Sequence, residues 1–296
     1  MNASSGFARW RRVEVPSPVD RGGAFVVEVS TDADGRCPDR LRGHLSPRTV
    51  DGLRALVRRA VLDRVGLGEE FGHADAAVAE LAAPRETAGA WLLFVPGLEA
   101  RPFWPVDAVP ALRELALAWK DIAAEAQDAA CRLARAPDQP HLTAPDAWKQ
   151  FHLWYSGRPT QGAAEACPRA IAVLRSVSES APVSRAYISA LRAGATIAPH
   201  HGPHNARLRS HLGLVAPAGA ELRVDGRAHR WTEGGLVLFD DSFRHEASNP
   251  TARERVVLVV DVPHPGLGRG DVVGLAAVLS VLTETARRLG IHGAPS

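Results

Sequence analysis

The chain has few cysteines and no long apolar run. Its cysteines, Cys37, Cys131 and Cys167, lie far apart, which excludes a CxxC redox motif or a cysteine-rich zinc site and argues against a disulfide framework. The longest apolar runs, such as 256–260, are far shorter than the roughly 18 residues of a membrane-spanning helix. Residues 1–13 lack the apolar stretch of a secretory signal. We therefore expect a cytoplasmic protein with no membrane partner.

The chain also has little net charge and almost no lysine. Lysine and arginine total 35 against 33 acidic residues, a net charge of +2, and only Lys120 and Lys149 are lysines. The arginines are scattered and form no basic stripe, so we expect no nucleic-acid partner. With 46% hydrophobic and 23% charged residues among 296, the chain can bury a full core in one or two domains.

Two regions are expected along the chain. Residues 1–92 are predicted to form an N-terminal α/β accessory region, with a helix that Ser46 caps and Pro47 begins. Residues 93–296 are predicted to form a barrel domain with a helix at about 111–134. A C-terminal helix over 271–289 is expected to end at Gly290 and to pack on the outside of the barrel.

Between about 147 and 262 the apolar period changes from helical spacing to two. Short runs separated by Gly, Pro, Asn and Asp predict strands at 185–191, 206–215, 221–224, 236–239 and 253–262. Strands at this spacing without helices between them favour an antiparallel sandwich or barrel over a parallel sheet. The expected fold class is therefore mainly β with flanking helices.

The strand predicted at 206–215 has two chemically different faces. Arg207, Arg209 and His211 lie on one face, and leucines dominate the other. One explanation is a half-exposed strand with its polar face in water. The alternative is that the polar face looks into a barrel, where arginines need an anionic ligand. Arg255, with Arg209, His211 and a hydroxyl from Ser189, would then suit a dicarboxylate.

Two histidines could form a metal site. His200 ends a predicted strand, and His245 lies 45 residues later, a separation that neighbouring barrel strands can bridge. Two imidazoles suit Fe, Zn or Cu. The carboxylate that a non-haem iron triad places two residues after the first histidine is replaced here by Gly202. By spacing alone, each histidine could equally be a surface or hydrogen-bonded residue.

The sequence resembles the aspartyl/asparaginyl β-hydroxylase family, which consists of Fe(II)- and 2-oxoglutarate-dependent oxygenases on a double-stranded β-helix. The resemblance covers roughly residues 93–266 and is carried by the strings PHHGPHNARLRSHLGL at 199–214, FDDSFRHE at 239–246 and DVPHP at 261–265. Further counterparts occur in the same order at 95–98, 101–104, 119–120, 148–151 and 157–158. The resemblance implies a double-stranded β-helix, or jelly-roll (cupin-like), core.

The resemblance also implies roles for individual residues. It implies that His200 and His245 bind iron, and that the missing carboxylate beside Gly202 is normal for the family. The positions that hold 2-oxoglutarate are matched by Ser189, Arg209, His211 and Arg255. The positions that grip the carboxylate or amide of the target side chain are matched by Gln150 and Arg207.

The resemblance implies a hydroxylase that uses Fe(II), 2-oxoglutarate and O2. Its substrate would be an amino acid or amino-acid residue, most simply the β-carbon of Asp or Asn, free, peptidyl or carrier-bound. Three alternatives stay open: hydroxylation of another free amino acid such as proline, halogenation at the site beside Gly202, and a non-catalytic barrel that binds a metal or carboxylate. The sequence does not indicate the oligomeric state.

Overall fold

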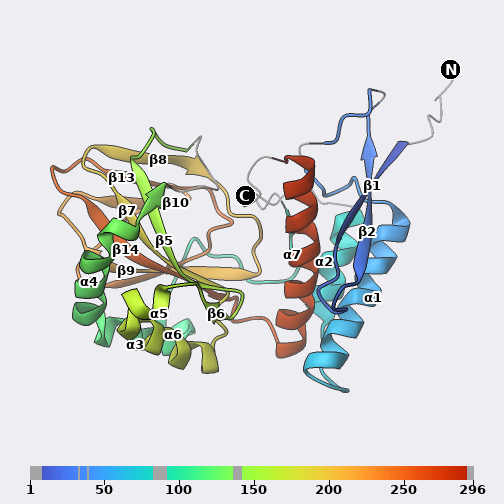
Figure 1. Cartoon of the computed structure of the whole chain (residues 1–296), viewed down its shortest axis with the longest axis horizontal. Coiled ribbons are helices and arrows are strands. Elements are labelled where there is room, and N and C mark those ends of the chain that lie inside the picture. Colours follow the sequence, from blue (N-terminus) through green and yellow to red (C-terminus); the bar gives the residue numbers. More distant parts are fainter. Residues whose placement is uncertain (1–8, 33, 39, 83–91, 136–141, 292–296) are drawn as a thin grey trace. The chain divides into compact units, whose positions relative to one another are not determined.

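The computed structural model describes residues 9–32, 34–38, 40–82, 92–135 and 142–291 (Figure 1). These residues form two compact units, one of residues 1–98 with 267–296 and the other of residues 99–266. Of the helices that the structure describes, none combines the length and the apolar composition that a bilayer crossing needs.

The second unit contains two antiparallel sheets. The larger sheet has the order β3-β12-β9-β14-β7-β5-β4, with β6 beside β5, and the smaller has the order β11-β10-β13-β8. The strands are β3 (Phe103–Trp104), β4 (Ala134–Arg135), β5 (Trp148–Tyr155), β6 (Arg158–Pro159), β7 (Arg185–Leu191), β8 (Ala195–His200), β9 (Arg207–Val215), β10 (Glu221–Val224), β11 (Arg227–Arg230), β12 (Leu236–Phe239), β13 (His245–Asn249) and β14 (Arg255–Pro263). From β7 to β14 the chain passes repeatedly between the two sheets, which is the strand order of a double-stranded β-helix. The expected fold is confirmed.

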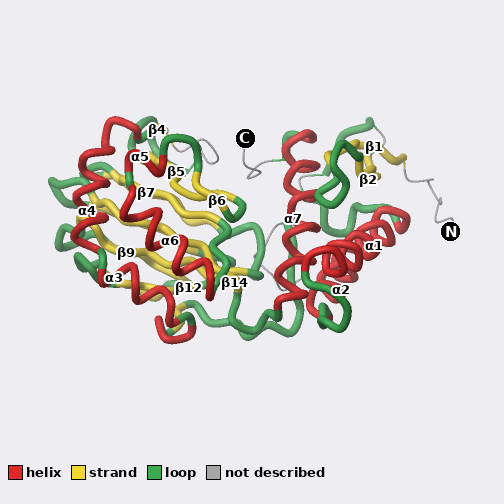
Figure 2. The backbone as a smooth tube through the Cα atoms, turned by 60° about the horizontal axis from the view of Figure 1, so that its bottom comes forward, coloured by secondary structure: helices red, strands yellow, loops and turns green. Residues whose placement is uncertain are grey.

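Helices cover the outer face of the larger sheet (Figure 2). They are α3 (Arg113–Leu117), α4 (Trp119–Asp128), α5 (Ala163–Ala166) and α6 (Pro168–Ser180), with 3₁₀ turns η1 (Val106–Ala108), η2 (Pro110–Leu112) and η3 (Ala129–Arg132). The single helix expected at 111–134 is thus divided into shorter pieces, with a break at Ala118. The leucines of β9 pack with these helices in one apolar cluster.

The polar face of β9 therefore looks into the barrel. Leu208, Leu212 and Leu214 are buried under the helices, while Arg209 and His211 point between the two sheets and are also largely buried. The explanation that placed this face in water is wrong, because the helices already cover the apolar face. Inside the barrel, a second apolar cluster from both sheets surrounds the polar side chains.

The first unit contains a hairpin and three helices. The hairpin is β1 (Arg9–Pro16) with β2 (Ala24–Thr31), and the helices are α1 (Pro47–Arg64), α2 (Gly72–Ala82) and α7 (Arg269–Leu289). As predicted, Ser46 caps α1 by accepting from the Thr49 N–H at 3.1 Å, and α7 ends at Gly290.

The C-terminal helix is placed differently from the expectation that it packs on the barrel. It packs against α1, α2 and β1, so residues 267–296 belong with the N-terminal unit. A Cβ at Gly274 would lie 2.9 Å from Val57 of α1 and 3.2 Å from Ala74 of α2, so glycine permits this close approach. The Asp271 carboxylate also accepts from the Ala74 N–H at 3.0 Å.

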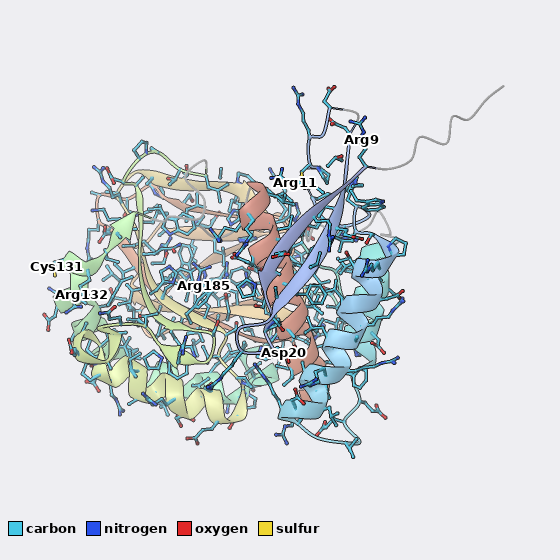
Figure 3. All side chains as sticks on the ribbon, turned by 45° about the vertical axis from the view of Figure 1, so that its right-hand side comes forward. Arg9, Arg11, Asp20, Cys131, Arg132 and Arg185 are labelled. Carbon is cyan, nitrogen blue, oxygen red and sulfur yellow. The ribbon has the colours of Figure 1, made fainter. Side chains whose placement is uncertain are left out.

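All three cysteines are free thiols. Cys167 is buried, and burial raises the pKa of its thiol to about 11. Cys131 is exposed at the edge of the second unit, next to Arg132 (Figure 3).

Candidate active site

The two predicted metal-binding histidines face each other inside the barrel. His200 is the last residue of β8 and His245 the first of β13, and the register of this strand pair makes them direct partners. Their ring centroids are 4.0 Å apart. The Nδ1 of His200 is 2.8 Å from the Ala198 carbonyl, and that of His245 is 2.9 Å from the Phe243 carbonyl. A carbonyl can only accept, so each Nδ1 carries the hydrogen and each Nε2 keeps its lone pair.

Both imidazoles are neutral near pH 7. Burial lowers the pKa of His200 to about 4, and burial with the neighbouring His200 lowers the pKa of His245 to about 3. A metal ligand must be a neutral imidazole with a free lone pair, and both residues meet this condition. Among the residues that the structure describes, no group of three His, Cys, Asp or Glu side chains could hold a metal ion. Within the described part of the chain, His200 and His245 therefore offer two nitrogen ligands without a third protein ligand beside them.

The space beside Gly202 is taken by Asp241. A Cβ at position 202 would lie 2.6 Å from Cγ of Asp241, and the Gly202 N–H donates to the Asp241 carbonyl at 2.6 Å. A carboxylate at position 202 and the Asp241 carboxylate cannot both occupy this region. In this chain Asp241 therefore fills the space that a ligand side chain at position 202 would need.

Arg207 and Arg209 are neutralised by two buried carboxylates. Arg207 Nη2 is 2.7 Å from Asp241 Oδ2 and its Nη1 is 3.0 Å from Asp261 Oδ2. Arg209 donates to both oxygens of Asp261 at 2.7 and 2.9 Å, and it reaches Asp241 at 3.1 Å. Burial alone would raise the pKa of Asp241, but the two guanidinium groups hold it well below its usual range. These two arginines therefore do not require an external anion.

Arg255 is in a different situation. Its side chain is 1% exposed, and no carboxylate among the described residues pairs with it. Its Nη1 donates to the backbone oxygen and the hydroxyl of Ser189 at 3.3 and 3.4 Å, while its Nε is buried without a partner. Burial lowers the pKa of Arg255 to about 10, so the group stays charged at pH 7. A buried, charged guanidinium without an acid is the place where a ligand carboxylate fits.

His211 and Gln150 lie on the same inner face of the larger sheet. His211 Nδ1 is buried without a hydrogen-bond partner. The Gln150 side-chain oxygen lies 3.1 Å from Nε2 of His152 and 3.5 Å from Nη2 of Arg185. Gln150 is on β5 and Arg207 on β9, so β7 and β14 separate the two residues predicted to bind the substrate.

The structure thus brings all eight predicted site residues into one barrel interior, but not into one cluster. From the sequence, Asp241 could equally form a turn, support a ligand or be one, and Asp261 has no predicted role, although it alternates with Arg255 on the inward face of β14. Trp231 was not predicted as a site residue, because it lies just after β11, where no periodic pattern marks it. The Trp231 ring lies 4.7 Å from the Arg255 guanidinium carbon.

The strand order and these side chains define a double-stranded β-helix protein with a neutral histidine pair inside its barrel. A family described as aspartyl/asparaginyl beta-hydroxylase matches residues 116–265. The chain belongs to this family, as the resemblance implied.

Individual relatives agree with this membership. The mouse protein named aspartyl/asparaginyl beta-hydroxylase is 36% identical over 182 residues, which are 58% of this chain and 24% of that protein. An ornithine lipid ester-linked acyl 2-hydroxylase of Rhizobium tropici is 30% identical over 174 residues, which are 55% of this chain and 61% of that protein. This chain spans about a quarter of the length of the mouse relative.

Among solved structures, a 2OG-Fe(II) oxygenase family oxidoreductase from Burkholderia pseudomallei matches with a TM-score of 0.38 and 16% identity. The match covers 59% of this chain and 96% of that one. The fold described above follows from the strand order of the chain itself.

Proposed function

We propose that the protein is an Fe(II)- and 2-oxoglutarate-dependent hydroxylase of an amino acid or amino-acid residue, with the β-carbon of Asp or Asn as the first candidate. The observation that carries this proposal is the pair of neutral histidines in the same barrel as a buried guanidinium that has no acid partner. Membership in the family supports the same reading.

In this proposal Nε2 of His200 and Nε2 of His245 hold the iron. Arg255 and Ser189 would receive the distal carboxylate of 2-oxoglutarate, and Arg209 and His211 would complete the 2-oxoglutarate site. When bound, iron, 2-oxoglutarate and O2 together supply the power to hydroxylate an unactivated carbon, which no side chain can supply.

The chain's own residues prepare this site in three ways. The carbonyls of Ala198 and Phe243 fix the orientation of the two imidazoles, as partners of metal-binding histidines usually do. Burial keeps both rings unprotonated and excludes water. The Asp241 and Asp261 carboxylates fix the Arg207 and Arg209 guanidinium groups at the start of β9.

Two observations support the proposed substrate: membership in the family, and the polar side chains of Gln150 and Arg207 in the barrel. Gln150 offers an amide, and Arg207, 13% exposed in its side chain, offers N–H donors beside its pairs with Asp241 and Asp261. Both suit a carboxylate or carboxamide on the target. The named relatives act on more than one kind of substrate, because one of them is an acyl 2-hydroxylase of an ornithine lipid. A test panel must therefore include free, peptidyl and lipid-linked amino acids.

The test measures products by mass spectrometry. The protein is loaded without oxygen with iron, 2-oxoglutarate and a panel of aspartyl, asparaginyl, prolyl and lipid-linked compounds, and is then exposed to air. We expect succinate and a product with one added oxygen. His200→Ala and His245→Ala should each abolish succinate formation, because one imidazole is too weak an iron site.

His73→Ala, in the other unit, is the matched control and should retain turnover. Full turnover in either ligand variant would refute the assignment of the histidines. Iron binding without consumption of 2-oxoglutarate across the whole panel would instead favour a non-catalytic barrel.

A further inference from the structure

Trp231 contacts two residues of the proposed cosubstrate site. It follows β11 directly, and its side chain is buried, with 4% exposed. Its ring centroid is 4.7 Å from the guanidinium carbon of Arg255 and 6.0 Å from the ring centroid of His211, to which it is nearly parallel at 24°. We call Trp231, Arg255, His211 and Ser189 the carboxylate cluster.

The carboxylate cluster contains three buried nitrogens that have no hydrogen-bond partner. They are Nε of Arg255, Nε1 of Trp231 and Nδ1 of His211. Two other buried indoles have partners, because Trp148 donates to the Ser189 hydroxyl at 3.0 Å and Trp154 donates to the Val183 carbonyl at 2.9 Å. The indole nitrogen of Trp104 on β3 is also buried without a partner, but it stands alone, whereas the three nitrogens of the carboxylate cluster lie on contacting side chains. Buried polar groups normally have partners, so three unmet nitrogens on contacting side chains indicate a ligand with acceptor oxygens.

A glycine allows Trp231 to reach this position. Gly213 faces inward on β9, in the same cross-strand row as Val257 and Ser189. A Cβ at Gly213 would clash with the carbonyl oxygen of Thr232. The missing side chain lets the turn after Trp231 lie across the sheet. The Gly234 N–H donates to the Gly213 carbonyl at 2.9 Å, and the Gly213 N–H donates to the Gly235 carbonyl at 3.0 Å, which holds the turn there.

We propose that Trp231 is a positioning residue for the cosubstrate. Its indole face holds the Arg255 guanidinium in place of a carboxylate, and its N–H joins the donors that receive the distal carboxylate of 2-oxoglutarate. This inference rests on the proposed function.

The contrast with Arg209 gives the physical reason. A ligand carboxylate that bound Arg209 would have to compete with Asp261, which already accepts two hydrogen bonds from that fork. An aromatic face stabilises a buried cation without taking up its N–H donors. Trp231 therefore keeps Arg255 charged and in place while leaving its Nε for the ligand.

The test compares Trp231→Leu and Trp231→Phe with Trp154→Phe, a buried tryptophan under the helices. Each variant, loaded with Mn(II), is titrated with 2-oxoglutarate by calorimetry, and tryptophan fluorescence is followed in parallel. Trp231→Leu should raise the Kd by about tenfold or more, because the cation–π contact and the N–H donor are both lost. Trp231→Phe keeps a ring and should raise it about threefold.

Further readouts separate positioning from a merely structural role. The turnover number at saturating 2-oxoglutarate should stay within about twofold of the unmodified protein, while KM for 2-oxoglutarate rises. Fluorescence quenching by 2-oxoglutarate should persist in Trp154→Phe and be reduced in Trp231→Phe, where Trp148 beside Ser189 remains.

A folded Trp231→Leu protein whose Kd lies within twofold of the unmodified protein overturns the proposal. If Trp231→Leu does not fold, an unchanged Kd and unchanged quenching in Trp231→Phe overturn it. If the unmodified protein binds no 2-oxoglutarate, the proposed function fails first, which distinguishes the two outcomes.

Discussion

Three buried arginines in one barrel are stabilised in two different ways. Arg207 and Arg209 share the Asp241 and Asp261 carboxylates, so that four charges cancel within the protein. Arg255 has an aromatic face and a hydroxyl but no acid. An unpaired buried charge is costly, and a ligand that pairs with it recovers that cost as binding affinity. The proposed anion site is therefore identified by Arg255, the buried arginine without an acid, and not by the number of arginines in the barrel.

Gly202→Asp should not restore a three-ligand iron site. The new side chain would begin 2.6 Å from Cγ of Asp241 and would place two carboxylates in one buried space. We expect a loss of about 1–3 kcal/mol in the free energy of unfolding from overpacking, and no gain in iron affinity. Urea denaturation and iron titration measure the two effects.

Gly72→Asp is the matched control, because Gly72 is exposed and no atom lies within 4 Å of its Cβ position. It should leave both quantities nearly unchanged. If the Gly202→Asp protein is as stable as the unmodified chain and binds iron more tightly, the expectation is wrong. The Asp241 side chain would then have moved out of the space beside position 202.

At the scale of elements, β9 joins the outer core to the site. Its apolar face packs under the helices, and its polar face carries Arg207, Arg209 and His211 into the barrel. Gly213, near its end, admits the turn that follows Trp231. Strand β9 therefore positions both the Arg207 and Arg209 ion pairs and the carboxylate cluster.

Gly213→Ala should weaken 2-oxoglutarate binding by displacing the backbone of the turn after Trp231. The added methyl group would meet the Thr232 carbonyl, a rigid backbone atom, so the turn and Trp231 must shift. We expect the Kd for 2-oxoglutarate to rise by about tenfold, which is the effect of losing the aromatic contact and a donor.

Calorimetric titration with 2-oxoglutarate measures this effect, and Gly72→Ala serves as the control for a glycine replacement with free space around it. An unchanged Kd in Gly213→Ala would mean that the turn does not position Trp231.

At the scale of the whole molecule, four histidines with lowered pKa values link stability to pH. Burial lowers the pKa of His200 to about 4, lowers those of His204 and His245 to about 3, and lowers that of His211 well below its usual value. In the unfolded chain each titrates near 6.5. Between pH 6.5 and about 4 the unfolded chain therefore binds protons that the folded chain does not, and stability falls as pH falls.

The metal-free protein should accordingly lose stability between pH 7 and pH 5. The loss is at most about 1.4 kcal/mol per pH unit for each such histidine. Asp240 offsets part of it, because burial raises its pKa to about 6 and the folded chain then binds that proton more readily. Urea denaturation at the two pH values tests the expectation, and equal stability at both would contradict it. Replacing His200 and His245 together by Gln should reduce the dependence but not remove it, because His204 and His211 remain.

The sequence by itself determined the family, the barrel class and the ranges of β7, β10 and β12, because alternation, turn residues and motif spacing are local properties of the chain. The eight residues that the sequence predicted for the site all lie in the barrel, and their roles stay predictions. Only the tertiary structure decided which arginine lacks an acid, because the carboxylates that neutralise Arg207 and Arg209 come from 34 and 52 residues away. It likewise placed Trp231 against Arg255 and grouped α7 with the N-terminal helices, since such contacts depend on which surfaces meet and leave no period in the sequence.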